Sequence, residues 1–191
     1  MTRRRCGVTI IELLGVLSIL SIIGAALFAT SLIGGRSYLG FETSAHVRGQ
    51  ARQALDAMAQ ELRQGGNAVT PAGDQCTFRM DVGYDLALPT ANCPNAVCWG
   101  ALDQNGAPHV GWSVRYRLNG AQLLREILDP GAVVQPGTRV LANDVNQLAF
   151  TYAAGTKTMT VQLQIRRASA QLAGGSLSTA LLVTRAKLRN P

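Results

Sequence analysis

Residues 3–14 read RRRCGVTIIELL, three arginines and a glycine followed by an apolar run that contains a single acid, Glu12. No charged residue occurs from Leu13 to Gly35, and Arg36 ends this uncharged run of 23 residues. About 20 apolar residues suffice to cross a membrane as a helix, because each adds about 1.5 Å and the hydrocarbon core is about 30 Å thick. The run therefore predicts a membrane-spanning helix.

Glu12 distinguishes this segment from simpler apolar segments, since a carboxylate there is unfavourable by about 2.5–3.5 kcal/mol on insertion scales. A secretory signal peptide is disfavoured because its apolar region is about 7–15 residues long and ends at a small-residue cleavage site. An ordinary single-pass anchor accounts for the arginines and the length, but not for Gly7 directly before the apolar run or for Glu12. A third interpretation leaves Glu12 inert at the headgroup boundary, with its carboxylate in water.

The order of basic leader, Gly7, apolar run and Glu12 resembles the class III signal of type IV prepilins and type II secretion pseudopilins. The resemblance implies that a membrane peptidase cuts between Gly7 and Val8, removing residues 1–7 as a leader, and methylates the new amino terminus of Val8. Glu12 would then be the fifth residue of the mature chain, the family's assembly position. The chain departs from the family pattern at two places. Val8 stands where the family usually has Phe, and no proline occurs near Ala29. The absence of this proline favours a minor rather than a major subunit.

The role implied for Glu12 also follows from electrostatics. The free amine of Val8 is positive near neutral pH, and in a dry bundle of helices it can pair with Glu12 of a neighbouring subunit. Such pairing offsets the cost of burying the carboxylate, and it occurs at only one axial offset between the helices. Glu12 is therefore predicted to set the register of assembly.

After Arg36 the sequence stays helical but becomes amphipathic. Apolar residues recur at three- and four-residue spacing and predict one buried face: Val47, Ala51, Ala54, Leu55, Met58 and Leu62. The residues after Gln64, Gly-Gly-Asn, predict the end of the helix. We therefore expect a membrane-spanning helix over 8–35 with an amphipathic continuation over 36–66. As one helix from Val8 to Gln64, it would be about 85 Å long.

Residues 67–191 carry the alternating patterns of strands and predict a β-rich periplasmic head. Alternation over 112–118, the Asn119-Gly120 turn and a return over 122–128 predict a hairpin. Further strands are predicted over 148–152, 159–165 and 181–188, and loops over 67–110 and between Ile127 and Leu141. The fold class is thus α+β, with about five mainly antiparallel strands packed on the amphipathic half of the helix.

Three cysteines, Cys76, Cys93 and Cys98, lie beyond the membrane on the oxidising side if the arginines stay in the cytoplasm. They allow three single pairings for one disulfide, among which sequence does not choose, and Cys6 belongs to the leader. His46 and His109 lack zinc-finger spacing to them. No metal or cofactor is expected.

Catalysis and nucleic-acid binding find little support in the chain. The histidines have no recognisable nucleophile signature beside them, and the glycine pairs lack the lysine of a phosphate loop. The aspartates are scattered without the order of an EF-hand: Asp81, Asp85, Asp103, Asp129 and Asp144. The formal charge of +7 falls to +4 without Arg3 to Arg5, and the basic residues form no stripe, so nucleic acid is not an expected partner.

Residues 140–152 and 188–190 resemble, more weakly, the larger minor pilins and pseudopilins of the PilW and J type. We expect a minor pilin or minor pseudopilin, anchored once in a bacterial inner membrane and then incorporated into a pilus or pseudopilus near its tip. The implied partners are other pilins, the prepilin peptidase, the inner-membrane assembly platform and membrane lipid. Two alternatives are a tip-displayed binding module that recognises a surface, DNA or a secreted substrate, and an anchored periplasmic protein that never polymerises.

Overall fold

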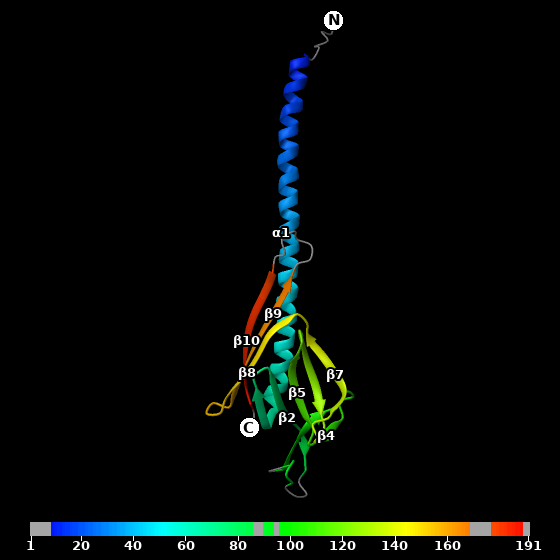
Figure 1. Cartoon of the computed structure of the whole chain (residues 1–191), viewed down its shortest axis with the longest axis vertical. Coiled ribbons are helices and arrows are strands. Elements are labelled where there is room, and N and C mark those ends of the chain that lie inside the picture. Colours follow the sequence, from blue (N-terminus) through cyan, green and yellow to red (C-terminus); the bar gives the residue numbers. More distant parts are fainter. Residues whose placement is uncertain (1–8, 86–89, 94–95, 169–176, 189–191) are drawn as a thin grey trace, which may run out of the picture.

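The computed structural model describes residues 9–85, 90–93, 96–168 and 177–188, without the side chains of 35–40 and 67–68. Its longest element is helix α1, Ile10–Gln64, whose 55 residues extend about 80 Å at 1.5 Å per residue. Figure 1 shows α1 as a continuous rod, with the strands gathered around its C-terminal part and the N-terminal end projecting away from them. The predicted long helix is confirmed from Ile10 onwards, and Val8 lies outside the described residues.

Helix α1 ends at Gln64, as predicted, and Gly65 provides the stop. The backbone N–H of Gly65 donates to the carbonyl oxygens of Glu61 and Leu62, while its own backbone is extended with φ −66° and ψ 142°. A Cβ at Gly65 would lie 3.0 Å from both the Leu62 oxygen and a ring carbon of Phe78. Glycine is therefore needed here for close packing and not for a left-handed conformation.

The described part of the head contains ten strands in two sheets. The larger sheet consists of β1 (Gly65–Ala72), β2 (Gln75–Tyr84), β3 (Val97–Leu102), β4 (Pro108–Val110), β5 (Ser113–Asn119), β6 (Gln122–Leu128) and β7 (Val134–Ala142). The smaller sheet consists of β8 (Val145–Ala153), β9 (Thr158–Ala168) and β10 (Leu177–Lys187). Their orders are β4-β3-β2-β5-β6-β7, with β1 paired to β2, and β10-β9-β8. All these pairs are antiparallel, which confirms the α+β class, but the expected number of about five strands was wrong.

Most of the missed strands lie in the segment 67–110, which was predicted to be a loop. In β2 the side chains of Cys76, Phe78 and Met80 are buried and their neighbours are half-exposed, a period-two pattern that the sequence does contain. In β3 the four residues after Val97 are all buried, so no alternation marks that strand. Short strands of this kind are stabilised by pairing with β2 rather than by their own pattern.

The second error concerns Pro136-Gly137, which was predicted to lie in a loop and instead lies within β7. This strand is at the edge of the larger sheet, where a proline needs no partner for its missing N–H. The register of β6 and β7 shifts between Arg125 and Ile127, and Gly137 has φ +109° beside that shift. An irregular edge strand therefore accommodates both residues.

The predicted β5–β6 hairpin is confirmed. Asn119 pairs with Gln122, so the turn consists of Gly120 and Ala121. Gly120 has φ +59°, in the left-handed region that a side chain disfavours. From this turn the ladder runs without a shift of register to Ser113 and Leu128.

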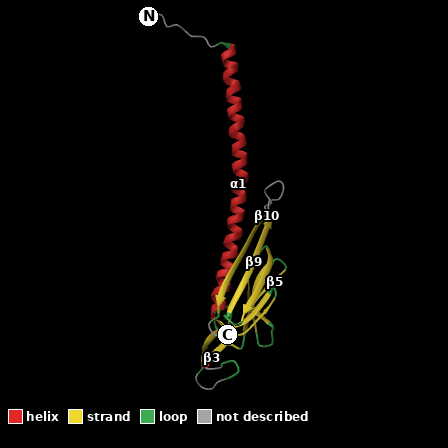
Figure 2. Ribbon diagram, turned by 90° about the vertical axis from the view of Figure 1, so that its left-hand side faces the viewer, coloured by secondary structure: helices red, strands yellow, loops and turns green. Residues whose placement is uncertain are grey.

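The predicted apolar face of α1 forms one side of the core. All six of its residues are buried: Val47, Ala51, Ala54, Leu55, Met58 and Leu62. These residues belong to one hydrophobic core, and α1 as a whole packs mainly against β10 and β9, with smaller contacts to β7 and β2. Figure 2 shows the strands along one side of the C-terminal part of α1. Each buried Leu or Met side chain contributes about 1.5–3 kcal/mol, so this face holds the head on the rod.

Candidate assembly site

The first turn of α1 contains the residue to which assembly was assigned. Thr9 is the N-cap residue, and its hydroxyl oxygen accepts from the backbone N–H of Glu12 at 3.4 Å. The Thr9 carbonyl oxygen also accepts from the N–H groups of Glu12 and Leu13, both at 3.1 Å. Thr9 and Glu12 thus have capping-box spacing, and a carboxylate in the first turn of a helix interacts favourably with the helix dipole. Thr9 therefore caps the start of the helix, and Glu12 lies in its first turn.

The carboxylate of Glu12 has no hydrogen-bond partner within the described residues, although its backbone N–H is capped. The two residues predicted to flank the cleavage site, Gly7 and Val8, lie outside the described part of the chain. Within Ile10–Gly34, Glu12 is the only ionisable residue. Its charge is therefore available to a group outside that segment.

One helical segment of the described chain, Ile10–Gly34, is long and apolar enough to cross a membrane. None of it is buried inside the protein, and the exposed fractions of Ile10 and Phe28 are 80% and 66%. Exposed apolar surface of this extent indicates an interaction surface.

The hydroxyl groups of Ser18, Ser21 and Thr30 in this segment are satisfied by the helix itself. The Ser18 hydroxyl donates to the Gly15 carbonyl oxygen at 2.8 Å, and the Thr30 hydroxyl donates to the Leu27 carbonyl oxygen at 2.9 Å. Such bonds to the preceding turn remove the need for water around a hydroxyl. The segment is thus compatible with apolar surroundings.

The cysteines separate into one disulfide and one thiol. Cys93 and Cys98 form a disulfide, which selects one of the three pairings left open by the sequence. Cys76 is free and lies in the core on β2, where burial raises the pKa of its thiol to about 12. This thiol is therefore protonated and unreactive at neutral pH.

The disulfide loop is attached to the larger sheet by polar contacts. Asn92 lies just before it, and its side-chain oxygen accepts from Arg79 of β2 at 3.0 Å. The Asn92 carbonyl oxygen accepts from the backbone N–H of Trp99 at 2.8 Å. These bonds stabilise the loop at the end of the head far from the apolar segment (Figure 1).

Asp103, one of the scattered aspartates, stabilises its own loop. The carboxylate of Asp103 accepts from the N–H groups of Asn105 and Ala107, both at 2.8 Å, and lies 3.3 Å from Nε2 of His109. The hydrogen bond from Ala107 is the main cause of a lowered pKa for Asp103. The described residues contain no group of three or more His, Cys, Asp or Glu side chains placed to hold a metal ion.

One charge cluster, missed at the sequence level, joins α1 to the larger sheet. The carboxylate of Glu61 accepts from the Tyr116 hydroxyl at 2.6 Å and from Nε of Arg125 at 2.9 Å. Burial, followed by the charge of Glu61, raises the pKa of Tyr116 well above its ordinary value, so the hydroxyl remains a donor. This contact fixes the rotation of α1 relative to the sheet.

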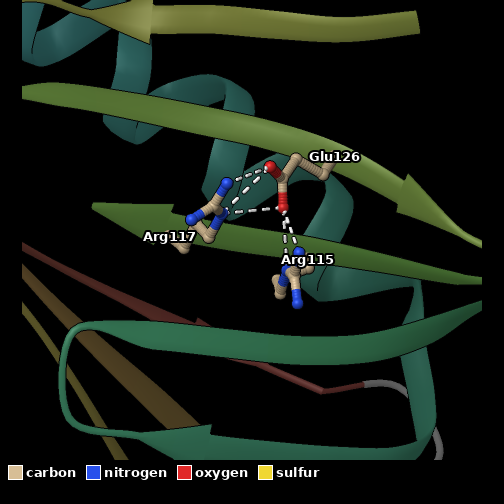
Figure 3. Close-up of polar contacts among 3 residues, drawn as sticks. All are labelled: Arg115, Arg117 and Glu126. Atoms are coloured by element: carbon tan, nitrogen blue, oxygen red, sulfur yellow. Dashed lines mark hydrogen bonds and ion pairs between the residues drawn. The ribbon is translucent and has the colours of Figure 1, made fainter. Parts of the chain in front are cut away.

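A second cluster lies between β5 and β6, where Glu126 is only 2% exposed. Figure 3 shows its carboxylate between two guanidinium groups, with Nη2 of Arg115 at 2.6 Å and Nη2 of Arg117 at 2.8 Å. Burial raises the pKa of Glu126, but the hydrogen bonds from Arg117 and Arg115 lower it by a larger amount. The pKa of Glu126 therefore lies below its ordinary value. The hairpin register, in which Arg115 is opposite Glu126, was the sequence signal that could have revealed this cluster.

Comparison with known proteins bears on the N-terminal segment. Residues 2–28 match the family model described as the prokaryotic N-terminal methylation motif. No curated protein and no solved structure matches the chain. The match includes Gly7, Val8 and Glu12 together with most of the exposed apolar segment. The chain thus carries a type IV pilin-like prepilin signal at residues 2–28, followed by an α+β pilin-like architecture.

Proposed function

We propose that this chain is a minor pilin or minor pseudopilin, a structural subunit of a type IV pilus or a type II secretion pseudopilus. One observation carries the proposal: a helical segment of 25 residues is apolar, fully exposed and continuous with the helix that holds the head. The methylation motif at residues 2–28 supports the same function. In the polymer, the exposed segments of many subunits cover one another.

Processing would generate the second partner of the assembly site. A prepilin peptidase cuts between Gly7 and Val8, and the free amine of Val8 is methylated and stays positive. In the polymer this amine pairs with Glu12 of a neighbouring subunit, whose carboxylate has no partner within the described part of its own chain. Pairing in apolar surroundings fixes the axial offset between two helices.

The continuity of α1 supports the minor role, and a position near the tip of the polymer is proposed with that role. No proline occurs between Ile10 and Gln64, so no helix breaker interrupts the rod. Before assembly, the subunit spans the bacterial inner membrane once, with its head in the periplasm and its arginines in the cytoplasm. Its partners are sibling pilins, the peptidase, the assembly platform and membrane lipid.

The experiment is to compare the subunit in sheared filaments from wild-type cells and from cells lacking the prepilin peptidase. In wild-type cells, we expect the filaments to contain a few copies of the chain for many copies of the major subunit. In cells that lack the peptidase, we expect the chain only in the membrane fraction. A chain that stays in the membrane of wild-type cells would contradict the proposal and favour an anchored periplasmic protein. A copy number close to that of the major subunit would contradict the minor role.

A second candidate is a binding module displayed at the tip. The end of the head opposite the N-terminal segment carries the disulfide loop and β4 (Figure 1). There His109 stacks on Trp112 with ring centroids 4.0 Å apart, and the exposed fractions of Tyr84 and Val110 are 69% and 47%. Changing Tyr84 and Val110 to serine separates the two functions. Filaments that assemble but lose adherence favour the binding module, and filaments unchanged in both respects favour a purely structural role.

A further inference from the structure

Strand β10 is a long and regular edge. It pairs with β9 over eleven residues, from Leu177 to Lys187, without a shift of register. Among the described residues, no backbone hydrogen bond joins its other side to a further element. About half of the N–H and C=O groups of a strand point to each side. At about 3.3 Å per residue, β10 thus presents a row of unpaired groups about 35 Å long.

The other edges of the head are protected in ways that β10 is not. Proteins protect sheet edges with short strands, prolines, bulges and charges. In β7 there are Pro136 and two register shifts, in β1 there are Pro71 and two shifts, and β4 has only three residues. The edge of β8 is tied to the larger sheet, because the N–H of Phe150 donates to the Gly73 carbonyl oxygen at 3.1 Å. Strand β10 has eleven residues, no proline and no register shift, and its only charged residues, Arg185 and Lys187, lie near its C-terminal end.

The side chains of β10 favour a partner on the exposed side. Ala180 and Ala186 are buried on the sheet face toward α1, whereas Leu181 and Val183 are 61% and 53% exposed. Charges occur only near the end of the strand, at Arg185 and Lys187. An exposed apolar strand without charges over its first eight residues is a template for pairing with another strand.

We propose that β10 is a docking edge, to which an edge strand of a different sibling subunit adds by backbone pairing; this inference rests on the proposed function. The partner strand is extended and apolar opposite Leu181 and Val183, with an acid near Arg185 or Lys187. At the end nearest the apolar segment, the Ser178 hydroxyl lies 3.1 Å from the Ser44 hydroxyl of α1. The edge therefore runs along the rod, where packing of apolar helices brings neighbouring heads together.

Orientation excludes a second copy that uses the same strand. Subunits of one polymer have the same orientation relative to the membrane, so two β10 strands meeting edge to edge would be parallel. Copies along a polymer are related by a screw operation, which brings two different surfaces together, so β10 of one copy would meet another edge of the next copy and not its β10. Antiparallel pairing would invert one head. Because the other edges of this chain are protected, the partner strand comes from a subunit of another sequence.

The test is co-purification of the full chain in detergent with each of the other prepilin-type subunits of the same organism. Leu181→Lys and Val183→Lys place a charge on exposed positions of the edge, and Val140→Lys is the matched control on β7, where Val140 is 49% exposed. We expect the lysine variants of β10 to reduce recovery of the sibling about tenfold, as edge lysines oppose strand addition. The Val140 variant should recover it as the wild type does. Unchanged thermal unfolding of each variant shows that its head is folded.

Hydrogen exchange of the wild-type chain provides a second readout that needs no variant. Amides of residues 177–187 should exchange more slowly in the complex than in the isolated chain. Equal exchange in both states, or lysine variants that recover the sibling normally, would overturn the docking edge while the proposed function stands. A wild-type chain that joins no sibling at all would overturn both.

Discussion

Arg125 and Glu126 are neighbours in β6, yet their side chains serve two different charge clusters on opposite faces of the sheet. Arg125 donates to Glu61 of α1 at 2.9 Å, and Glu126 accepts from Arg115 and Arg117 of β5. Successive residues of a strand point to opposite faces, so one dipeptide stabilises both the helix–sheet contact and the outer face of the hairpin. The first cluster positions the head on the rod, and the second stabilises the strands that carry it.

The contact between Glu61 and Arg125 predicts a large effect of a single substitution. Arg125→Met leaves the Glu61 carboxylate without its cation. Removing one partner of a fully buried pair costs about 3–5 kcal/mol, but the Glu61 side chain is 27% exposed, so we expect about 2 kcal/mol of lost stability. The measurement is thermal unfolding of the full chain in detergent, followed by near-ultraviolet circular dichroism. The control is Arg52→Met on the exposed side of α1, which should unfold as the wild type does, and an Arg125 variant of wild-type stability would contradict the assigned role.

Glu126 predicts a dependence of stability on pH. Its pKa is lowered in the folded chain, so the unfolded chain binds more protons in acid. The stabilisation is therefore complete above the unfolded value of about 4.3 and is lost as the pH falls through the lower folded value. Glu126→Gln should reduce stability at neutral pH, and the stability of this variant should fall less between neutral and acidic pH than that of the wild type.

The difference between the pH profiles of stability of the wild type and of Glu126→Gln gives the contribution of Glu126. Other groups of lowered pKa, such as Asp103, contribute equally to both profiles. Glu42→Gln, which removes an exposed acid of α1, is the matched control and should reproduce the wild-type profile. Parallel profiles for the wild type and the Glu126 variant would show that the carboxylate is not held by Arg115 and Arg117.

The cysteines predict a count of reactive thiols. At pH 8 the folded mature chain should take up no maleimide, because Cys76 is buried with a pKa of about 12 and Cys93 is bonded to Cys98. Denaturation without a reductant should expose one thiol, and reduction should expose three in total. Intact mass spectrometry measures each step. Rapid labelling of the folded chain, or a denatured mature chain with three thiols before reduction, would contradict this arrangement.

The leader predicts a defined mature terminus. Mass spectrometry of the subunit from wild-type membranes should find Val8 first, bearing one methyl group, and Cys6 absent. Gly7→Val should leave the leader attached and keep the chain out of filaments, whereas Cys6→Ser should be processed normally. An intact Met1 in wild-type cells would remove the free amine on which the assembly site depends.

The sequence predicts those features that depend on local patterns. The helix stop after Gln64 and the β5–β6 hairpin are visible because apolar spacing and turn residues are sufficient to define them. The pairing of Arg115 with Glu126 could have been predicted from the sequence, because the hairpin turn determines which residues of the two strands are opposite each other. The contact of Glu61 with Arg125 was not, because it joins residues 64 positions apart through the packing of a helix on a sheet. Strand β3 was likewise missed because burial on both faces removes its alternation.

The most direct measurement is the incorporation of a Glu12→Leu chain into sheared filaments, compared with Thr9→Ala, which removes the capping hydroxyl but keeps the acid. Both variants should insert into the membrane and lose the leader as the wild type does. If the carboxylate pairs with the amine of a neighbouring Val8, Glu12→Leu is absent from filaments and Thr9→Ala is incorporated. Equal incorporation of Glu12→Leu and the wild-type chain would contradict a role of the Glu12 carboxylate in assembly.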